Sequence, residues 1–305
     1  MQSWFTKQTR RNVDSRDGWS RFQPHREHVT NLLIYRERPG TSVMFAAENV
    51  PISSAQGTNT ARPRERLLVL GAGNCNDLDL SRLTEHFAEV HLVDMDGAAL
   101  AWGVAQQSTN QKHPDRIALH GGIDLCGIAD ACASWRPQSP PNDAALTAVI
   151  EQAQAAMPLR ELADFDVTAS VCLLSQMIEI VAQSLGDAHP RFLEMIAAIR
   201  LRHLQLLFES LREKGTGVLV TDFVSSATCS ELATVAEADL PGLLKRLIAA
   251  RNFFSGLNPF VLEALLHQSP DFSARVTSIQ LSRPWRWDLG PRVYACCALS
   301  GMLVQ

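Results

Sequence analysis

Residues 67–80 have the sequence Leu67-Leu-Val-Leu-Gly71-Ala-Gly73-Asn-Cys-Asn76-Asp77-Leu-Asp-Leu80. The four apolar residues that open this stretch predict a short buried strand. Gly71 and Gly73 permit a tight backbone turn beneath a ligand, and Asn76 or Asp77 can cap a helix that follows. The stretch therefore predicts a strand, a glycine-rich turn and a helix, an arrangement typical of nucleotide-binding proteins.

A second apolar stretch follows after one helix length. Its sequence, Val90-His-Leu-Val-Asp94, predicts a strand that ends in an acid, 21 residues after Gly73. An acid at this position can bind the hydroxyl groups of a ribose. The alternative is that Asp94 only caps the helix that begins near Asp96. Its place at the end of a strand favours cofactor binding.

Composition excludes several classes of protein. The 305 residues suit one large α/β domain with an extension. A formal net charge of −4 and a pI near 6.1 do not favour a nucleic acid or an anionic membrane as partner. The seven cysteines form no Cys-x-x-Cys pair and are expected in the core of a cytoplasmic protein. We expect no signal peptide and no membrane-spanning segment.

The chain is expected to divide into an N-terminal cap with a connector, residues 1–64, and a main domain, residues 65–305. The first 40 residues are rich in arginine, which we interpret as a solvated cap before a phosphate-binding patch. Residues 52–66 are polar and rich in turn formers, as in a connector. A partly apolar helical face within residues 15–50 is formed by Val29, Leu32, Leu33 and Tyr35.

Strand and helix patterns alternate along the main domain. The expected strands are 67–70, 90–94, 116–120, 164–174 and 217–222, and the expected helices include 77–87, 96–107 and 190–215. Such alternation predicts a doubly wound, mostly parallel α/β sheet. Two last strands, 276–281 and 292–299, have no helix between them and predict an antiparallel hairpin at one edge. The expected sheet has seven strands.

With these elements in place, the chain resembles the class I S-adenosylmethionine-dependent methyltransferases from about Glu65 to the C-terminus. The terminal hairpin is the most distinctive topological mark of that family. The resemblance implies a Rossmann-like fold and S-adenosylmethionine as the cofactor. It also implies methyl transfer to oxygen or nitrogen of an acceptor, a reaction that needs chiefly proximity and orientation from the protein.

The resemblance implies roles for particular residues. The glycine turn approaches the methionine end of the cofactor, Asp94 binds the ribose, and Met95 packs on the adenine. Asp124, after the third strand, faces the adenine edge, and the fourth strand ends beside the methyl group. The cofactor-binding residues expected on this basis are Gly71, Ala72, Gly73, Asn74, Asn76, Asp94, Met95, Asp124 and Ser170.

Two positions depart from the family pattern. Val69 stands where an acid is usual, and Cys75 stands where a third glycine is usual. Asn74 and Asn76 add hydrogen-bonding groups for the amino and carboxylate groups of the cofactor. The fourth strand lacks both the Asn/Asp-Pro-Pro-aromatic run of amino-group methyltransferases and the Pro-Cys nucleophile of cytosine enzymes. A small-molecule acceptor is therefore favoured over a nucleic acid.

The sequence shows no general base in the main domain. His25 and His28 are candidates if the cap folds over the site. Their spacing also suits a helical metal pair, but no third ligand is nearby, so no metal is predicted. Trp19 and Phe22 can form a lid, or they can pack the cap onto the domain, which is the favoured interpretation. Whether the protein forms a homodimer is left open.

Two other classes of function compete with this interpretation. The pattern Gly71-x-Gly73-x-x-Asn76 resembles the fingerprint of NAD(P)-dependent oxidoreductases with its last glycine replaced, although Asn76 and the terminal hairpin count against that class. A non-catalytic descendant of the methyltransferase fold is favoured by Cys75, by Val69 and by the missing base. A cleft filled by side chains would support this last hypothesis.

Overall fold

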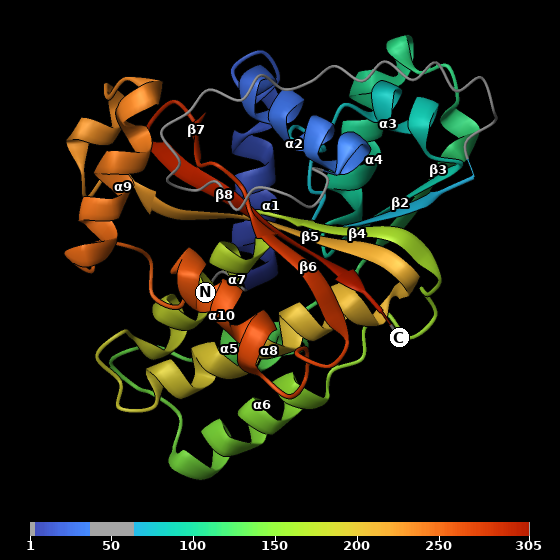
Figure 1. Cartoon of the computed structure of the whole chain (residues 1–305). Helices are drawn as coiled ribbons and strands as arrows, with labels where there is room; N and C mark the ends of the chain where they lie inside the picture. The colour runs from blue at the N-terminus through green and yellow to red at the C-terminus, as the bar shows by residue number, and fades with distance from the viewer. Residues whose placement is uncertain (1–3, 37–63, 305) are drawn as a thin grey trace.

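The computed structural model describes residues 4–36 and 64–304. A central sheet with helices on both faces dominates it (Figure 1). The strands are β1 (Arg66–Leu70), β2 (Glu89–Asp94), β3 (Ile117–Gly121), β4 (Phe165–Val171), β5 (Leu211–Ser225), β6 (Val276–Leu281), β7 (Trp285–Asp288) and β8 (Val293–Leu303). Their order is β3-β2-β1-β4-β5-β8-β6, and β7 pairs with β8.

The first five strands are parallel, and β8 runs antiparallel to β5 and to β6. In the class I methyltransferase fold, the first strand lies near the centre of a parallel sheet, and an antiparallel strand lies beside the fifth strand. The sheet of this protein has that topology. The predicted fold class is confirmed. The carboxyl ends of the parallel strands share one edge of the sheet, where ligands bind in such folds.

The helices cover the sheet in two groups. Above the sheet in Figure 1 lie α2 (Gln23–Tyr35), α3 (Leu80–His86) and α4 (Gly97–Gln107). Below it lie α5 (Ala129–Ala133), α6 (Asp143–Ala155), α7 (Leu173–Leu185), α8 (Phe192–Glu209) and α10 (Pro259–Gln268). Two further helices, α1 (Trp4–Asp14) and α9 (Leu240–Ala249), lie towards the carboxyl edge.

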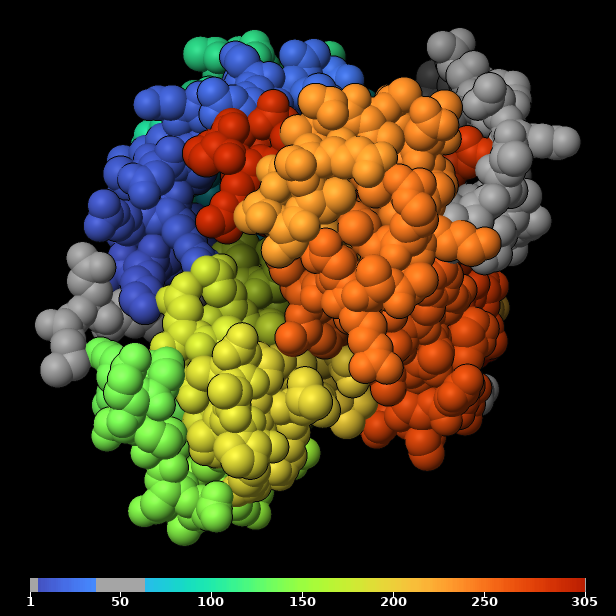
Figure 2. Space-filling model, turned by 90° about the vertical axis from the view of Figure 1, so that its left-hand side faces the viewer, coloured from blue at the N-terminus to red at the C-terminus, as the bar shows by residue number. Residues whose placement is uncertain are grey.

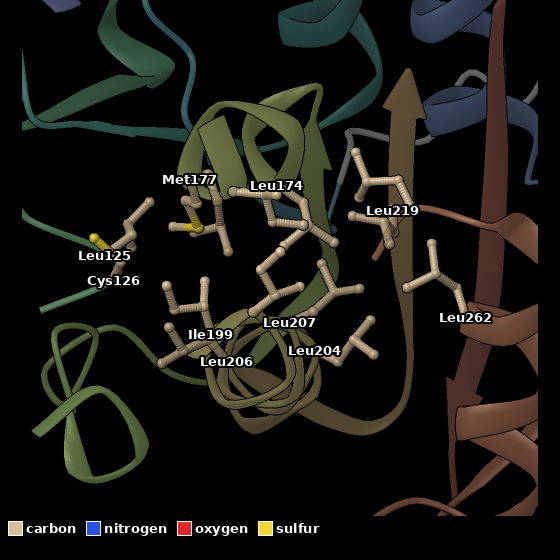
Figure 3. Close-up of a cluster of buried hydrophobic side chains, with 14 of the residues drawn as sticks. Leu125, Cys126, Leu174, Met177, Ile199, Leu204, Leu206, Leu207, Leu219 and Leu262 are labelled. Carbon is tan, nitrogen blue, oxygen red and sulfur yellow. The ribbon is translucent and has the colours of Figure 1, made fainter. Parts of the chain in front are cut away.

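Each face of the sheet has its own hydrophobic core. Alternate residues of β1 point to opposite faces, so Leu67 and Val69 belong to the core beneath α2, α3 and α4. Leu68 and Leu70 belong to the larger core on the α7 and α8 side. Figure 3 shows part of that larger core, where leucines of α7, α8 and β5 meet. This two-sided burial explains the continuous apolar run that predicts β1.

Several predicted boundaries differ in the structure. The strand expected at 164–174 ends at Val171, and the helix expected at 77–87 begins at Leu80. The helix expected to end at Gly215 ends at Glu209, and residues 211–216 extend β5 instead. Leu211 already pairs with Phe165 of β4, across an irregularity in the register. Residues 211–216 therefore join the sheet instead of continuing the helix, because they lie beside β4, which the local sequence does not reveal.

The predicted terminal hairpin also gains a strand. The expected connection, residues 282–291, contains β7, whose Trp285 and Trp287 pair with Cys296 and Tyr294 of β8. Both tryptophan side chains are buried against the α2 side of the sheet. The sheet of the described residues accordingly has eight strands, one more than predicted.

The N-terminal segment contributes two helices, of which only α2 falls within the predicted helical region. Val29 and Leu33 of its apolar face are fully buried, whereas Tyr35 is exposed. The predicted connector lies almost wholly outside the described residues. Within the two described ranges, no helix is long and apolar enough to cross a membrane.

Candidate functional site

The glycine turn after β1 adopts the left-handed backbone that its sequence predicts. The φ angles are +76° at Gly71 and +49° at Gly73, and Cys75 also has a positive φ of +55°. A Cβ on Gly71 would lie 2.9 Å from the Leu173 side chain, so glycine is needed where α7 begins. The Cys75 thiol is buried in the core on the α2 side and does not line the cavity described below.

Asp94 lies at the end of β2, directly beside the glycine turn. Its Oδ2 accepts a hydrogen bond from Gly73 N at 2.9 Å, and its Oδ1 accepts one from Asp96 N at 2.8 Å. Burial raises the pKa of Asp94, and the two backbone N–H groups oppose that shift. Each carboxylate oxygen keeps a lone pair with which it can accept a ligand hydroxyl.

Four of the predicted cofactor residues converge on one cavity at the carboxyl edge of β1 to β3. They are Gly71, Asp94, Met95 and Asp124. The cavity is completed by Gln8, Ile123, Leu125, Cys126, Leu173, Met177 and Ile180. Its volume is about 30 Å³, enough for a water molecule or two. A nucleoside-sized ligand needs on the order of several hundred Å³.

Asp124 lines this cavity and also holds the start of α5. Its Oδ1 accepts a hydrogen bond from Cys126 N at 3.0 Å, and its Oδ2 accepts one from Ala129 N at 2.8 Å. The Asp124 carboxylate therefore orders the backbone at the start of α5 and also borders the cavity.

The helix α1 closes the cavity from outside the main domain. Asn12 Nδ2 donates to Asp96 Oδ2 at 3.0 Å, which attaches α1 to the start of α4. Asn74 Nδ2 donates to the backbone oxygen of Asn12 and to Ser15 Oγ. Asn76 Nδ2 donates to the backbone oxygen of Ser15 at 2.7 Å. Both loop asparagines thus bind the N-terminal segment, and neither lines the cavity.

The other three predicted residues do not line the cavity either. Ala72 and Gly73 belong to the same turn, beside Gly71. Ser170 lies inside β4 and is fully buried, with its Oγ 2.8 Å from His203 Nε2 of α8. Ser170 therefore contributes to the interface between sheet and helix.

A second group of polar residues lies at the same edge of the sheet, near the carboxyl ends of β1, β4 and β5 and the amino end of β8. We call it the acceptor-side cluster, and it comprises His25, Asp77, Ser175, Asp222 and Tyr294. Ser175 Oγ donates to Asp222 Oδ1 at 2.5 Å. Tyr294 of β8 pairs with Ser225 of β5, three residues after Asp222. Burial raises the pKa of Tyr294 and the charge of Asp222 adds to this shift, whereas Arg292 opposes it.

Both acids of this cluster have raised pKa values. Burial raises the pKa of Asp222 to about 6, and the hydrogen bond from Ser175 opposes the shift. Burial raises the pKa of Asp77 to about 7; Arg26 opposes this shift and the charge of Asp222 adds to it. The side chain of Asp77 is 25% exposed, so the cluster is open to solvent at this point.

Sequence reasoning missed both acids as site residues. Asp77 was expected as a helix cap, but Asp79 caps α3 by accepting a hydrogen bond from Arg82 N at 3.1 Å. Asp222 ends the strand expected at 217–222. An acid that follows an apolar strand is the signal that identified Asp94, and it applies equally to Asp222.

The N-terminal helices lie against the C-terminal strands, where blue and red segments touch in Figure 2. His25 contacts Trp285 and Trp287 of β7. Trp285 Nε1 donates to His25 Nδ1 at 3.0 Å, so the neutral ring carries its proton on Nε2. That Nε2 lies 3.6 Å from Asp77 Oδ1. Burial, together with His28, lowers the pKa of His25 to about 3. The ring is neutral near pH 7.

The cap packs onto the domain through aromatic contacts. The His25 ring stacks on Trp287 with 4.6 Å between centroids, and Phe22 meets the same indole edge-on at 5.8 Å. His28 contacts Trp285, and burial lowers the pKa of His28 to about 4. The favoured interpretation of the cap aromatics as packing residues agrees with these contacts for Phe22.

No protein-family model matches the sequence, and no curated protein matches it significantly. Among solved structures, the CurJ carbon methyltransferase is 13% identical with a TM-score of 0.39, over 80% of this chain and 50% of that chain. The methyltransferase domain of bacterial CtHen1-CN is 12% identical with a TM-score of 0.39, over 78% of this chain and 90% of that domain.

An O-methyltransferase family protein from Burkholderia thailandensis is 10% identical with a TM-score of 0.42, over 99% of this chain and 62% of that protein. The chain therefore spans half the length of the first of these proteins and under two thirds of the last. The strand order and the antiparallel β8, described above, define its class: a class I methyltransferase fold.

Proposed function

We propose that this protein is an S-adenosylmethionine-dependent methyltransferase that acts on oxygen or nitrogen of a small molecule. The observation that carries the proposal is the convergence of Gly71, Asp94, Met95 and Asp124 on one cavity at the carboxyl edge of the sheet. When bound, S-adenosylmethionine supplies a methyl group on a positively charged sulfur. The protein has to orient the two reactants and exclude water.

The chemistry of the cavity suits an adenosine group. Asp94 has free lone pairs for ribose hydroxyls, and Met95 with Ile123 offers apolar surface for a base. The volume is too small while α1 is in place. Cofactor binding therefore requires α1 to move away from the glycine turn.

The acceptor-side cluster supplies the general base that the sequence did not reveal. A base works best when its pKa lies near the operating pH. His25 and His28, with pKa values near 3 and 4, are weak bases. Asp77, with a pKa near 7, meets the requirement better, and we assign the role of base to Asp77.

The first experiment is calorimetric titration of the whole protein with S-adenosylmethionine, S-adenosylhomocysteine, NADH and NADPH. We expect micromolar affinity for the first two ligands only. Asp94→Ala should weaken their binding at least about tenfold, because it removes charge-assisted hydrogen bonds. Asp115→Ala, an exposed acid between β2 and β3, is the matched control and should bind normally. Unchanged affinity in Asp94→Ala would overturn the assignment of Asp94, and binding of dinucleotides alone would indicate an oxidoreductase.

A second candidate is a non-catalytic protein with this fold. The small volume of the cavity, about 30 Å³ with Gln8 of α1 in its lining, favours this candidate. Absence of binding by all four ligands would support this candidate, provided that Asn12→Ala, which loosens α1, also fails to bind.

A further inference from the structure

Helix α1 is attached to the main domain chiefly by polar contacts. Among its described side chains, only Gln8 and Asn12 are buried, and both are amides. Neither hydrophobic core of the described residues contains a side chain of α1. Arg11 pairs with Glu179 of α7 at 2.7 Å, but these side chains are 36% and 48% exposed, and exposed ion pairs stabilise little. The attachment of α1 is therefore weaker than that of a helix that packs into a core.

Asn12 lies against the glycine turn at the place where a ligand can approach the backbone. Glycine has no side chain, so its backbone admits another group at close range. A Cβ added to Gly73 would lie 3.4 Å from Asn12 Oδ1 and 4.0 Å from Asp94 Oδ2. Asn12 thus lies on the same side of the turn as Asp94, which we assign to the ribose. A cofactor that extends from Asp94 along the turn would meet Asn12.

The chain from Asn12 to Ser15 occupies the polar groups on both sides of the turn. Asn12 Nδ2 donates to Asp96 Oδ2, as an ammonium group would. The backbone oxygens of Asn12 and Ser15 accept hydrogen bonds from Asn74 and Asn76, as a carboxylate would. This stretch therefore presents the same kinds of donor and acceptor as the amino-acid end of S-adenosylmethionine.

We propose that residues 12–15, which we call the occluding segment, compete with the amino-acid end of S-adenosylmethionine for the groups beside the glycine turn. The inference rests on the proposed function. In the closed state, the occluding segment bonds to these groups and α1 covers the cavity. In the open state, the cofactor takes over the same bonds. The apparent affinity for the cofactor is then lowered in proportion to the fraction of protein that is closed.

The first test uses variants that weaken the closed state. Asn12→Ala removes the hydrogen bond to Asp96, and Asn12→Asp places a carboxylate against that acid. In calorimetric titrations of the whole protein, we expect S-adenosylhomocysteine to bind about threefold to tenfold more tightly to Asn12→Ala and more tightly still to Asn12→Asp. Arg10→Ala is the matched control, because Arg10 lies on the same helix with its side chain 71% exposed. Its affinity should be unchanged.

A further variant acts at the other attachment of α1. Glu179→Gln removes the ion pair with Arg11 and alters no group beside the glycine turn. It should tighten the binding of S-adenosylhomocysteine by up to about threefold, since an exposed ion pair contributes little. The melting temperature of each variant shows whether it is folded. Agreement between Glu179→Gln and the Asn12 variants separates release of α1 from a local effect at Asn12.

Two measurements on the unsubstituted protein need no variant. The first is the affinity for 5′-methylthioadenosine, which lacks the amino-acid end. It should bind at least about tenfold more weakly than S-adenosylhomocysteine, because it leaves the amides of Asn74 and Asn76 unpaired once the occluding segment is released. The second is tryptic cleavage after Arg10 and Arg11, measured by mass spectrometry. Saturating S-adenosylhomocysteine should increase this cleavage, because it releases α1.

The outcomes separate this inference from the proposed function. Weaker or unchanged binding of S-adenosylhomocysteine in both folded Asn12 variants would overturn the inference, as would protection of Arg10 and Arg11 from trypsin by this ligand. Equal affinity for the two ligands would also overturn it, because the amino-acid end would then gain nothing from release of the segment. All of these results leave the proposed function intact. Absence of binding of S-adenosylhomocysteine to every variant would overturn the proposed function and the inference with it.

Discussion

Asp77 and Asp94 both follow apolar strands, yet their surroundings give them different properties. Asp94 accepts two backbone N–H groups, which stabilise its charged form against burial. Asp77 has an unpartnered Oδ1 and lies near the charge of Asp222, so its pKa rises to about 7. The same residue type therefore suits ligand binding at one position and proton transfer at the other.

Asp77→Asn should change how stability depends on pH. The folded protein holds a proton on Asp77 up to about pH 7, whereas the unfolded chain releases it near the ordinary pKa of 3.8. Stability contributed by the protonated acid is therefore lost as pH rises from about 4 to 7, by up to roughly 1.4 kcal/mol per pH unit. Urea unfolding at pH 4.5 and pH 8 should show the variant gaining stability relative to the unsubstituted protein only at the higher pH. An equal difference at both pH values would contradict the raised pKa.

Only some of the individual site residues could be predicted from the sequence. Gly71 and Asp94 follow from local sequence, because a strand before a turn specifies where they lie. The roles of Asn74, Asn76 and His25 depend on residues that are distant in the chain, such as Ser15 and Trp285. No local pattern encodes such contacts.

Helix α4 approaches the backbone of the glycine turn closely at Gly103. A Cβ added to Gly103 of α4 would lie 2.2 Å from the backbone oxygen of Asn74, so only glycine fits there. The position of the turn, and with it the position of Asp94, depends on this approach. The helix thus tolerates a glycine in its interior despite the lower helix propensity of that residue.

Gly103→Ala should destabilise the protein by about 1–3 kcal/mol through overpacking, despite the better helix propensity of alanine. Gly242→Ala in α9 is the matched control, because a Cβ there meets nothing within 4 Å. The control should stabilise the protein by up to about 1 kcal/mol. Denaturant unfolding of both variants tests this contrast. A stable Gly103→Ala variant would show that the turn can shift away from α4.

Helix α1 allows a test of access to the cavity. Asn12→Ala removes the hydrogen bond from Asn12 Nδ2 to Asp96 Oδ2. Since α1 has to move before a nucleoside can bind, we expect faster association of S-adenosylhomocysteine and cleavage of α1 by protease at lower protease concentration. Stopped-flow fluorescence and limited proteolysis measure these effects. Slower association would instead indicate that α1 in its present place helps to form the bound site.

The elements themselves were predictable where local sequence decides them. The apolar runs of β1 and β2 and the helix predicted at 96–107 follow the prediction closely, although the residue that caps α4 is Asp96 and not Asp94. Residues 211–216 and β7 were missed because each becomes a strand by pairing with a distant partner, Phe165 in one case and β8 in the other. Helix α1 was not predicted, and its contacts with the cavity and with Asp96 are made to residues that are distant in the chain.

For the molecule as a whole, the strand order places both candidate sites at one edge of the sheet. Residues at the carboxyl ends of β1, β2 and β3 line the cofactor cavity, and residues near the carboxyl ends of β1, β4 and β5 and the amino end of β8 belong to the acceptor-side cluster. The turn after β1 belongs to both. The N-terminal helices cover this edge, so the cap controls access to the cofactor cavity and completes the cluster through His25.

The hydrogen bond from Trp285 to His25 joins residues 260 positions apart. During synthesis, α2 emerges from the ribosome long before β7 and β8 are made. Until those last strands emerge, Val29 and Leu33 of α2 lack part of the core in which they are finally buried. The surroundings of His25 are therefore completed only when β7 has been synthesised.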